Sequence, residues 1–237
     1  PYKLIMVFGK KGSGKTTFLA KTAYRYLKKG YPVVIRTIPS VIGGDEEKRK
    51  GIVTAKSPVA KKMGVVTAEP LFIARRKCPN LKVFKGDYEL YRKRSDELYE
   101  YFCKFTPTVE RFSIDECFLD MTNYLMKDTL LNKAMEIKKR IKEELGFTVN
   151  IGISTNKLLA KMASDFEKPD KIHTLYPHEI QMKMWSLPVK ELFMLGRKTV
   201  PKLYNMNVKT IGDLAKCDMK QLINKFGKHG KTMWEYA

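Results

Sequence analysis

Asp115 and Glu116 stand side by side between two apolar runs, residues 108–114 and 117–121. Both runs alternate and are rich in aromatic and β-branched residues, which is typical of strands. The two acids interrupt the pattern where a two-residue hairpin loop would connect the strands. Side chains at a tight turn can converge, and converged carboxylates suit a hard divalent cation such as Mg²⁺. The alternative is an ordinary acidic turn at the surface.

The charge of the chain narrows the choice of partners. Its 237 residues include 46 Lys and Arg against 25 Asp and Glu, a net charge of +21. A strongly basic folded chain points to a polyanion, most often nucleic acid, although a ribosome or an anionic membrane surface would satisfy the charge equally well. No apolar run is long enough to span a bilayer, and no membrane partner is expected.

Length and cysteine use indicate the class of protein. A chain of this length can bury a substantial core and is expected to divide into two or three compact units. Its four cysteines form no Cys-x-x-Cys pair, and its three histidines are scattered. The sequence therefore predicts a reduced, cytoplasmic protein without a cysteine or zinc site.

Residues 9–16, GKKGSGKT, match the phosphate-binding pattern G-x-x-x-x-G-K-[ST], between an apolar strand at 3–8 and a helix at 17–29. Glycines let backbone N–H groups curl around phosphates, the lysine adds positive charge, and the threonine can hold Mg²⁺. The residues concerned are Gly9, Gly12, Gly14, Lys15 and Thr16. Residues 2–32 resemble the opening of P-loop ATPases of the filamentous-phage assembly type, which implies ATP binding.

Strands and helices alternate from residue 38 to about 170, as in an α/β or α+β unit with a mixed sheet. Strands are predicted at 38–45, 51–55, 81–84 and 147–153, and helices at 60–63, 70–77, 88–102, 129–145 and 157–166. Ser154 or Thr155 can cap the last of these helices.

After Pro177 the pattern changes to short helices at 179–185, 189–194, 199–204, 211–215 and 221–226. The turn at 195–199 lies between two of them, as in a helix-hairpin-helix. Such a turn offers backbone N–H groups to a DNA phosphate without reading sequence. Its residues include Gly196, Arg197, Lys198 and Thr199. The alternative is a helical linker without a binding role.

Several segments, taken together, resemble the Y-family (translesion) DNA polymerases over about residues 36–237. They are residues 38–45, 50–66, 69–81, 113–116 (SIDE), 152–157 (GISTNK), 163–165 (ASD), 168–170 (KPD) and 211–214 (IGDL). The order and spacing of these segments carry the resemblance.

The resemblance implies an α+β fold with a mixed-sheet polymerase palm, small fingers and a helical helix-hairpin-helix thumb. The implied domains are a P-loop strand–loop–helix segment at 1–35, fingers at 36–86, palm at 87–175 and thumb at 176–237. The P-loop βα unit replaces the first βα unit of the family's palm. Because the two are similar in length, the strand at 3–8 is expected to pack where the family's first strand lies.

The resemblance also implies a reaction, template-directed nucleotidyl transfer in translesion synthesis and DNA repair. Asp115 and Glu116 would bind two Mg²⁺ ions that align the primer 3′-hydroxyl with the α-phosphate of the incoming nucleotide. Lys168, and with it Lys61, would bind the triphosphate. The implied partners are a DNA primer–template, a deoxynucleoside triphosphate and, at the P-loop, ATP.

The sequence departs from the family in two ways. The family's first strand carries a further metal-binding aspartate, whereas residues 3–8 contain no acid. Metal binding and catalysis are therefore expected to weaken, and neither Asp165 nor Asp120 is expected to substitute. No counterpart of the family's additional DNA-gripping domain precedes Ala237, so we expect weak, strongly salt-dependent template binding.

Two other functions fit the residues. A P-loop NTPase would use Lys15 and Thr16, with residues 112–116 as its second motif, and would need the strand at 108–114 to lie parallel beside the strand at 3–8. A DNA-binding module without chemistry would need only the positive charge and the turn at 195–199.

Overall fold

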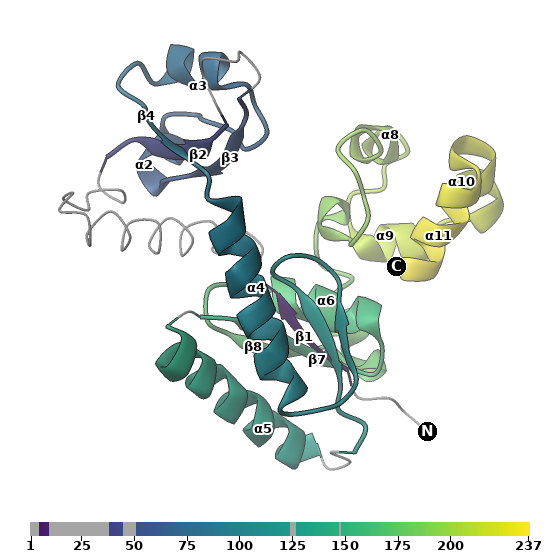
Figure 1. Ribbon diagram of the computed structural model, residues 1–237. Helices are drawn as coiled ribbons and strands as arrows, with labels where there is room; N and C mark the ends of the chain where they lie inside the picture. Colours follow the sequence, from purple (N-terminus) through teal and green to yellow (C-terminus); the bar gives the residue numbers. More distant parts are fainter. Residues whose placement is uncertain (1–4, 10–37, 45–50, 124–126, 147) are drawn as a thin grey trace. The chain divides into compact units, whose positions relative to one another are not determined.

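The computed structural model describes residues 5–9, 38–44, 51–123, 127–146 and 148–237. They fall into two compact units, one made of Pro1–Gly9 with Phe102–Ala237 and the other of Lys10–Tyr101 (Figure 1). Most of the P-loop motif and the helix expected at 17–29 lie outside the described residues, which include only Gly9 of that motif.

A five-stranded sheet organises the first unit, in the order β5-β6-β1-β7-β8. The strands are β1 (Ile5–Gly9), β5 (Val109–Arg111), β6 (Cys117–Asp120), β7 (Asn150–Ser154) and β8 (Ile172–Thr174). β1 pairs antiparallel with both β6 and β7, whereas β7 and β8 are parallel. The mixed sheet is therefore confirmed, and the strand expected at 3–8 lies at its centre.

Helix α6 (Lys157–Asp165) packs against β7, β1 and β8, as Figure 1 shows for β1 and β7. Its N-cap is Asn156, whose Oδ1 accepts the backbone N–H of Leu159 at 2.8 Å. The predicted caps were wrong, because β7 continues through Ser154. A Cβ atom on Gly152 would lie 1.9 Å from the carbonyl oxygen of Ala160, so only glycine lets helix and strand approach this closely.

Helix α5 (Lys127–Arg140) also packs against β7, and its last turn continues as a π-helix, Ile141–Leu145. Four residues at helical spacing form its fully buried stripe: Leu130, Ala134, Ile137 and Ile141. The helix predicted at 129–145 is thereby confirmed.

The acidic hairpin differs from its prediction. β5 ends at Arg111, and residues 112–116 form a five-residue loop in place of a two-residue turn. The backbone N–H groups of Phe112 and Ser113 both donate to the carbonyl oxygen of Glu116, at 2.9 and 3.2 Å. These two bonds close the loop around Ile114 and Asp115, just beyond the last β5–β6 pair, Arg111 with Cys117.

The C-terminal part of this unit is helical. Its elements are η2 (Pro177–Glu179), α7 (Ile180–Lys183), η3 (Val189–Glu191), α8 (Val200–Tyr204), α9 (Ile211–Ala215), α10 (Met219–Phe226) and α11 (Lys228–Tyr236). The helix predicted at 189–194 was wrong, because only a 3₁₀ turn forms there. A shared core of buried Leu192, Leu203, Ile211, Leu214 and Leu222 holds the short helices together.

The second unit contains a three-stranded sheet in the order β3-β2-β4, with β2 antiparallel to β3 and parallel to β4. Its elements are β2 (Ser40–Gly43), β3 (Val53–Lys56), α2 (Pro58–Lys62), α3 (Leu71–Lys77), β4 (Lys82–Lys85) and α4 (Tyr88–Cys103), which runs on into the first unit. Buried Val41, Val53, Ala60, Leu71 and Ala74 form its core. Ser57 caps α2 by accepting the N–H of Ala60 at 3.1 Å. The strands and helices predicted between residues 38 and 102 are all present, with shifted ends.

No helix in the described ranges is both long and apolar enough to cross a bilayer.

Candidate active site

Asp115 and Glu116 lie at the end of the five-residue loop, immediately before β6. Asp115 is half-buried, and its Oδ1 accepts a hydrogen bond from the hydroxyl of Ser113 at 3.0 Å. Glu116 is half-buried, and its Oε1 accepts a hydrogen bond from Nζ of Lys161 at 2.7 Å. The two acids are therefore adjacent but differently held, one by its own loop and the other by helix α6.

Lys161 stands at the centre of a chain of ion pairs. Its side chain is only 4% exposed, and its ammonium also contacts Oδ2 of Asp165 at 3.3 Å. Asp165 in turn forms an ion pair with Lys168. The structure thus connects Glu116 to Lys168 through two residues on α6: Lys161, for which no role was predicted, and Asp165, which was not expected to substitute for the missing carboxylate. The i, i+4 spacing of Lys161 and Asp165, just after the strand, is the signal that could have identified them.

The local fold explains why Lys161 reaches Glu116. Asn156 fixes the start of α6, and Gly152 lets the helix lie directly on β7. Buried Ala160 packs against Phe118 of β6, so the helix also covers the strand that follows the acids. The next residue along the helix is Lys161, which therefore projects at the level of Glu116.

Burial shapes the electrostatics of this region. Burial lowers the pKa of Lys168, while the hydrogen bond to Asp165 opposes that shift and favours the charged ammonium. Burial also raises the pKa of the Cys117 thiol to about 11. Cys117 therefore stays protonated at neutral pH, although it follows Glu116 directly, and is a poor metal ligand or nucleophile.

A third carboxylate is missing from the described part of this edge. Phe8 of β1 pairs with Cys117, so β1 reaches the level of the acids, yet its sequence IMVFG contains none. Asp120 lies at the opposite end of β6, opposite Ile5, and its Oδ1 accepts the N–H of Thr122 at 3.0 Å. Among the described residues, no group of three or more His, Cys, Asp and Glu could hold a metal ion.

Two carboxylates nevertheless have the right donor chemistry for a hard divalent cation. Mg²⁺ in phosphoryl-transfer sites is held by one or two carboxylates together with substrate phosphates and water. Asp115 accepts a hydrogen bond from a neutral hydroxyl, that of Ser113, whereas Glu116 is paired with the ammonium of Lys161. The residues present therefore fit a weak metal site in which Glu116 must share its charge with a lysine.

The turn predicted to hold a DNA backbone lies in the same unit. Gly196, Arg197 and Lys198 are exposed, and the carbonyl oxygen of Gly196 accepts the N–H of Thr199 at 3.0 Å, just before α8. Phe193, which precedes the turn, packs against Phe112 of the acidic loop with ring centroids 5.8 Å apart. The turn is thereby anchored beside the acidic loop.

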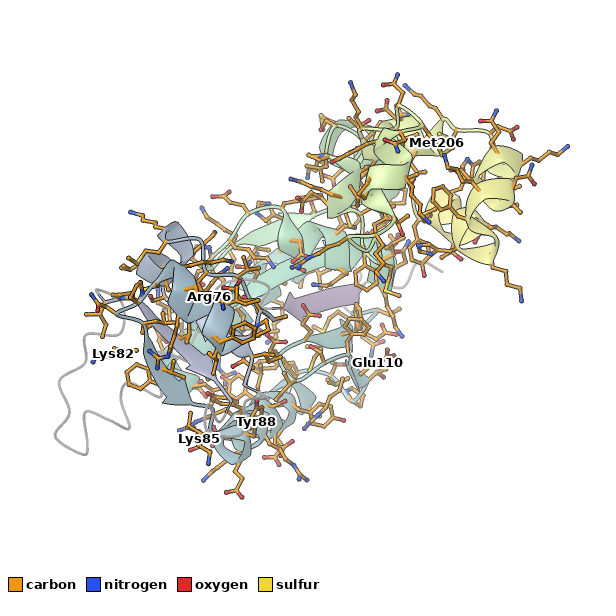
Figure 2. The ribbon with its side chains drawn as sticks, turned by 90° about the horizontal axis from the view of Figure 1, so that it is seen from above. Arg76, Lys82, Lys85, Tyr88, Glu110 and Met206 are labelled. Atoms are coloured by element: carbon orange, nitrogen blue, oxygen red, sulfur yellow. The ribbon has the colours of Figure 1, made fainter. Side chains whose placement is uncertain are left out.

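Lys61 is exposed on α2, which belongs to the second unit. That unit carries further basic side chains, and Figure 2 labels Arg76, Lys82 and Lys85 among them. The guanidinium of Arg76 lies 5.8 Å from the ring centre of Phe72, which is 59% exposed.

The sheet order argues against the NTPase interpretation. That interpretation needs the strand at 108–114 to lie parallel beside the strand at 3–8. In the structure β6 separates β5 from β1, and both neighbours of β1 are antiparallel to it. Asp115 and Glu116 are therefore not placed as the second motif of a P-loop NTPase.

Comparison with known proteins identifies the chain. The model of the impB/mucB/samB family matches residues 12–165, more than half of the sequence. The chain belongs to this family. The resemblance to Y-family DNA polymerases is thereby confirmed.

Its relatives are DNA polymerases. DNA polymerase IV from Clostridium acetobutylicum is 55% identical over 222 residues, which cover 94% of this chain and 56% of that protein. DNA polymerase IV from Acetivibrio thermocellus is 43% identical over 215 residues, covering 87% and 52%. The impB/mucB/samB chain described here thus spans little more than half the length of either relative.

Solved structures support the fold. DinB from Sulfolobus solfataricus has a TM-score of 0.82 at 23% identity, covering 99% of this chain and 66% of that one. An insertion ternary complex of Dbh DNA polymerase has a TM-score of 0.79 at 22% identity, covering 99% and 67%. At these identities the likeness establishes the α+β polymerase fold alone.

Proposed function

We propose that this chain is the core of a Y-family DNA polymerase that carries out template-directed nucleotidyl transfer in translesion synthesis and DNA repair. The observation that carries the proposal is the meeting of the acidic loop with α6, which connects Glu116 to Lys168 within one unit. In this assignment residues 36–86 act as fingers, 87–175 as palm and 176–237 as thumb.

Asp115 and Glu116 would hold two Mg²⁺ ions. When bound, these ions would align the primer 3′-hydroxyl with the α-phosphate and neutralise charge that develops in the transition state. Lys168, which has Asp165 as its partner without nucleotide, and Lys61 would donate to the phosphates of the incoming nucleotide. The chain itself would thus supply two carboxylates for the metal ions and two lysines for the triphosphate.

The proposed site is weaker than a three-carboxylate site. β1 offers no acid, and Lys161 shares the charge of Glu116. Each effect lowers the affinity for a divalent cation. We therefore expect slow transfer that needs more metal ion than a site with three carboxylates would.

The exposed turn at Gly196, Arg197, Lys198 and Thr199 would hold the duplex backbone, as a helix-hairpin-helix does. Contacts of this kind are to phosphate and are independent of base sequence. With a net charge of +21, binding should fall steeply as salt is raised.

The P-loop motif could act separately by binding ATP through Lys15 and Thr16. Its support is the complete pattern in the sequence, directly after the end of β1 at Gly9. ATP binding that is lost in Lys15→Ala, while DNA synthesis is retained, would establish the two as independent.

Single-nucleotide insertion tests the polymerase proposal. A labelled primer on a template is incubated at low salt with the protein, Mg²⁺ or Mn²⁺, and each of the four deoxynucleoside triphosphates in turn. We expect insertion of the nucleotide complementary to the template base, and loss of insertion in Glu116→Gln. Tight DNA binding without insertion by the parent protein would instead favour a binding module without chemistry.

A further inference from the structure

Four charged side chains alternate in sign along a line from the acidic loop to the end of α6: Glu116, Lys161, Asp165 and Lys168. Lys161 contacts two acids, and Asp165 contacts two lysines. The two ends of the line are the proposed metal ligand and the proposed triphosphate ligand. The four formal charges sum to zero, so a change at one end must be balanced along the line.

We propose that this line of ion pairs couples nucleotide binding at Lys168 to metal binding at Glu116, with Lys161 as the positioning residue that moves between two acids. Without nucleotide, Lys161 neutralises Glu116 and competes with a cation for it. When phosphates take Lys168, Asp165 loses a partner and draws Lys161 toward itself. The carboxylate of Glu116 is then released to a divalent cation. This inference rests on the proposed polymerase function.

The geometry makes the exchange small. Nζ of Lys161 is 2.7 Å from Glu116 and 3.3 Å from Asp165, so it already contacts both acids. Lys161 and Asp165 are four residues apart on one helix, where side chains are neighbours. A change of partner therefore needs a rotation about side-chain bonds and no movement of the backbone.

Burial makes the exchange necessary. The side chain of Lys161 is 4% exposed, so its ammonium cannot move into water when Glu116 binds a cation. A buried charge that loses its partner is strongly destabilising, so Lys161 needs another acid. Asp165 already contacts this ammonium through Oδ2, but it shares its charge with Lys168, which pairs with Oδ1. Removing Lys168 from Asp165 should therefore favour metal binding at Glu116, and by reciprocity metal should favour release of Lys168.

Titration with Mn²⁺ alone, followed by the electron paramagnetic resonance signal of the free ion, tests this coupling without DNA or nucleotide. Lys168→Met mimics the departure of Lys168 and should tighten Mn²⁺ binding by about fivefold or more. Lys161→Met should tighten it as well, because the competitor is gone. The matched control is Lys157→Met, on the same helix, whose lysine pairs with Glu110 on the surface and should change the affinity less than about twofold.

A double-mutant cycle separates coupling through Asp165 from simple removal of a positive charge. In the Asp165→Asn background Lys161 has only Glu116, so Lys168→Met should no longer tighten Mn²⁺ binding. An equal effect of Lys168→Met in both backgrounds, or no effect in the parent, would overturn the coupling.

The failures of the two proposals are distinguishable. Mn²⁺ binding that is lost in Glu116→Gln but insensitive to Lys168→Met overturns the coupling alone. If neither the parent protein nor Lys161→Met binds Mn²⁺, the proposed metal site is overturned, and the coupling with it. Circular dichroism of each variant in the titration buffer verifies that the fold is retained.

Discussion

The contact between α6 and β7 at Gly152 is the strongest steric constraint on the candidate site, and Gly152→Ala tests it. A Cβ atom at this position would lie 1.9 Å from the carbonyl oxygen of Ala160 and 2.5 Å from the backbone nitrogen of Ser164. Cβ contacts in proteins essentially never fall below 3.0 Å. The helix would therefore have to move away from the strand by about 1.1 Å.

The loss of stability in Gly152→Ala depends on which atoms must move to make room for the new Cβ. Both clashing atoms belong to the backbone, so no side chain can rotate out of the way. Overpacking a core costs about 1–3 kcal/mol, and we expect a value near the upper end, about 3 kcal/mol. That is a large share of the roughly 5–15 kcal/mol that stabilises a typical domain. The same movement would displace Lys161 relative to Glu116 and break the 2.7 Å hydrogen bond between them.

Urea unfolding followed by circular dichroism measures the loss of stability, and Mn²⁺ titration measures the effect on the acids. The control is Gly230→Ala, where the new Cβ would lie 2.1 Å from the carbonyl oxygen of Leu222, in α10. Gly230→Ala should also lose stability but retain its Mn²⁺ affinity. A Gly152→Ala protein within about 0.5 kcal/mol of the parent would refute the packing argument.

Three further substitutions test other parts of the structure. Met194 is 65% exposed and has a φ of 71°, a left-handed conformation that glycine adopts without strain, so Met194→Gly should stabilise the chain by about 0.5–1 kcal/mol in urea unfolding. The control is Met182→Gly, at an exposed position in α7, which should destabilise the chain. Equal effects of the two substitutions would contradict backbone strain at Met194. Backbone N–H groups lower the pKa of Asp213, so its contribution is present above about pH 4 and is lost as pH falls further. Asp213→Asn should therefore reduce the fall in urea midpoint between pH 7 and pH 3, and an unchanged fall would contradict this. Phe8 of β1 pairs with Cys117, so Gly9, the next residue of β1, lies at the level of Glu116. Gly9→Asp should therefore supply the missing carboxylate and tighten Mn²⁺ binding severalfold. An unchanged Mn²⁺ affinity would contradict this cross-strand alignment.

Local pattern was sufficient to predict most of the elements but not how they end. The strand at 3–8 was predicted from its apolar run, and β1 indeed occupies the centre of the sheet. The prediction of a two-residue turn was wrong, because backbone hydrogen bonds to the carbonyl oxygen of Glu116 close a longer loop. Backbone bonds of this kind leave no signal in the pattern of side chains. β8 was missed because three residues with one partner strand carry little local signal. α11 was missed because Gly230 interrupts its helical pattern. In the structure this glycine lets the backbone of α10 lie close to α11.

The site was predictable only in part, for a similar reason. Asp115, Glu116 and Lys168 follow from motifs that can be recognised in the sequence, although their roles stay predictions. Lys161 lies between recognised residues, and only the packing of α6 on β7 and β1 shows that its ammonium meets Glu116. Charged residues on helices usually face solvent, so the sequence alone would predict an exposed Lys161.

Primer extension by the parent protein and by Asp115→Ala tests the central claim most directly. The reaction is run at low salt with Mg²⁺ and with Mn²⁺, because template binding and metal binding are both expected to be weak. The account predicts templated extension by the parent protein, faster with added metal ion, and none by Asp115→Ala. Extension by Asp115→Ala at the rate of the parent, or no extension by either protein, would contradict it.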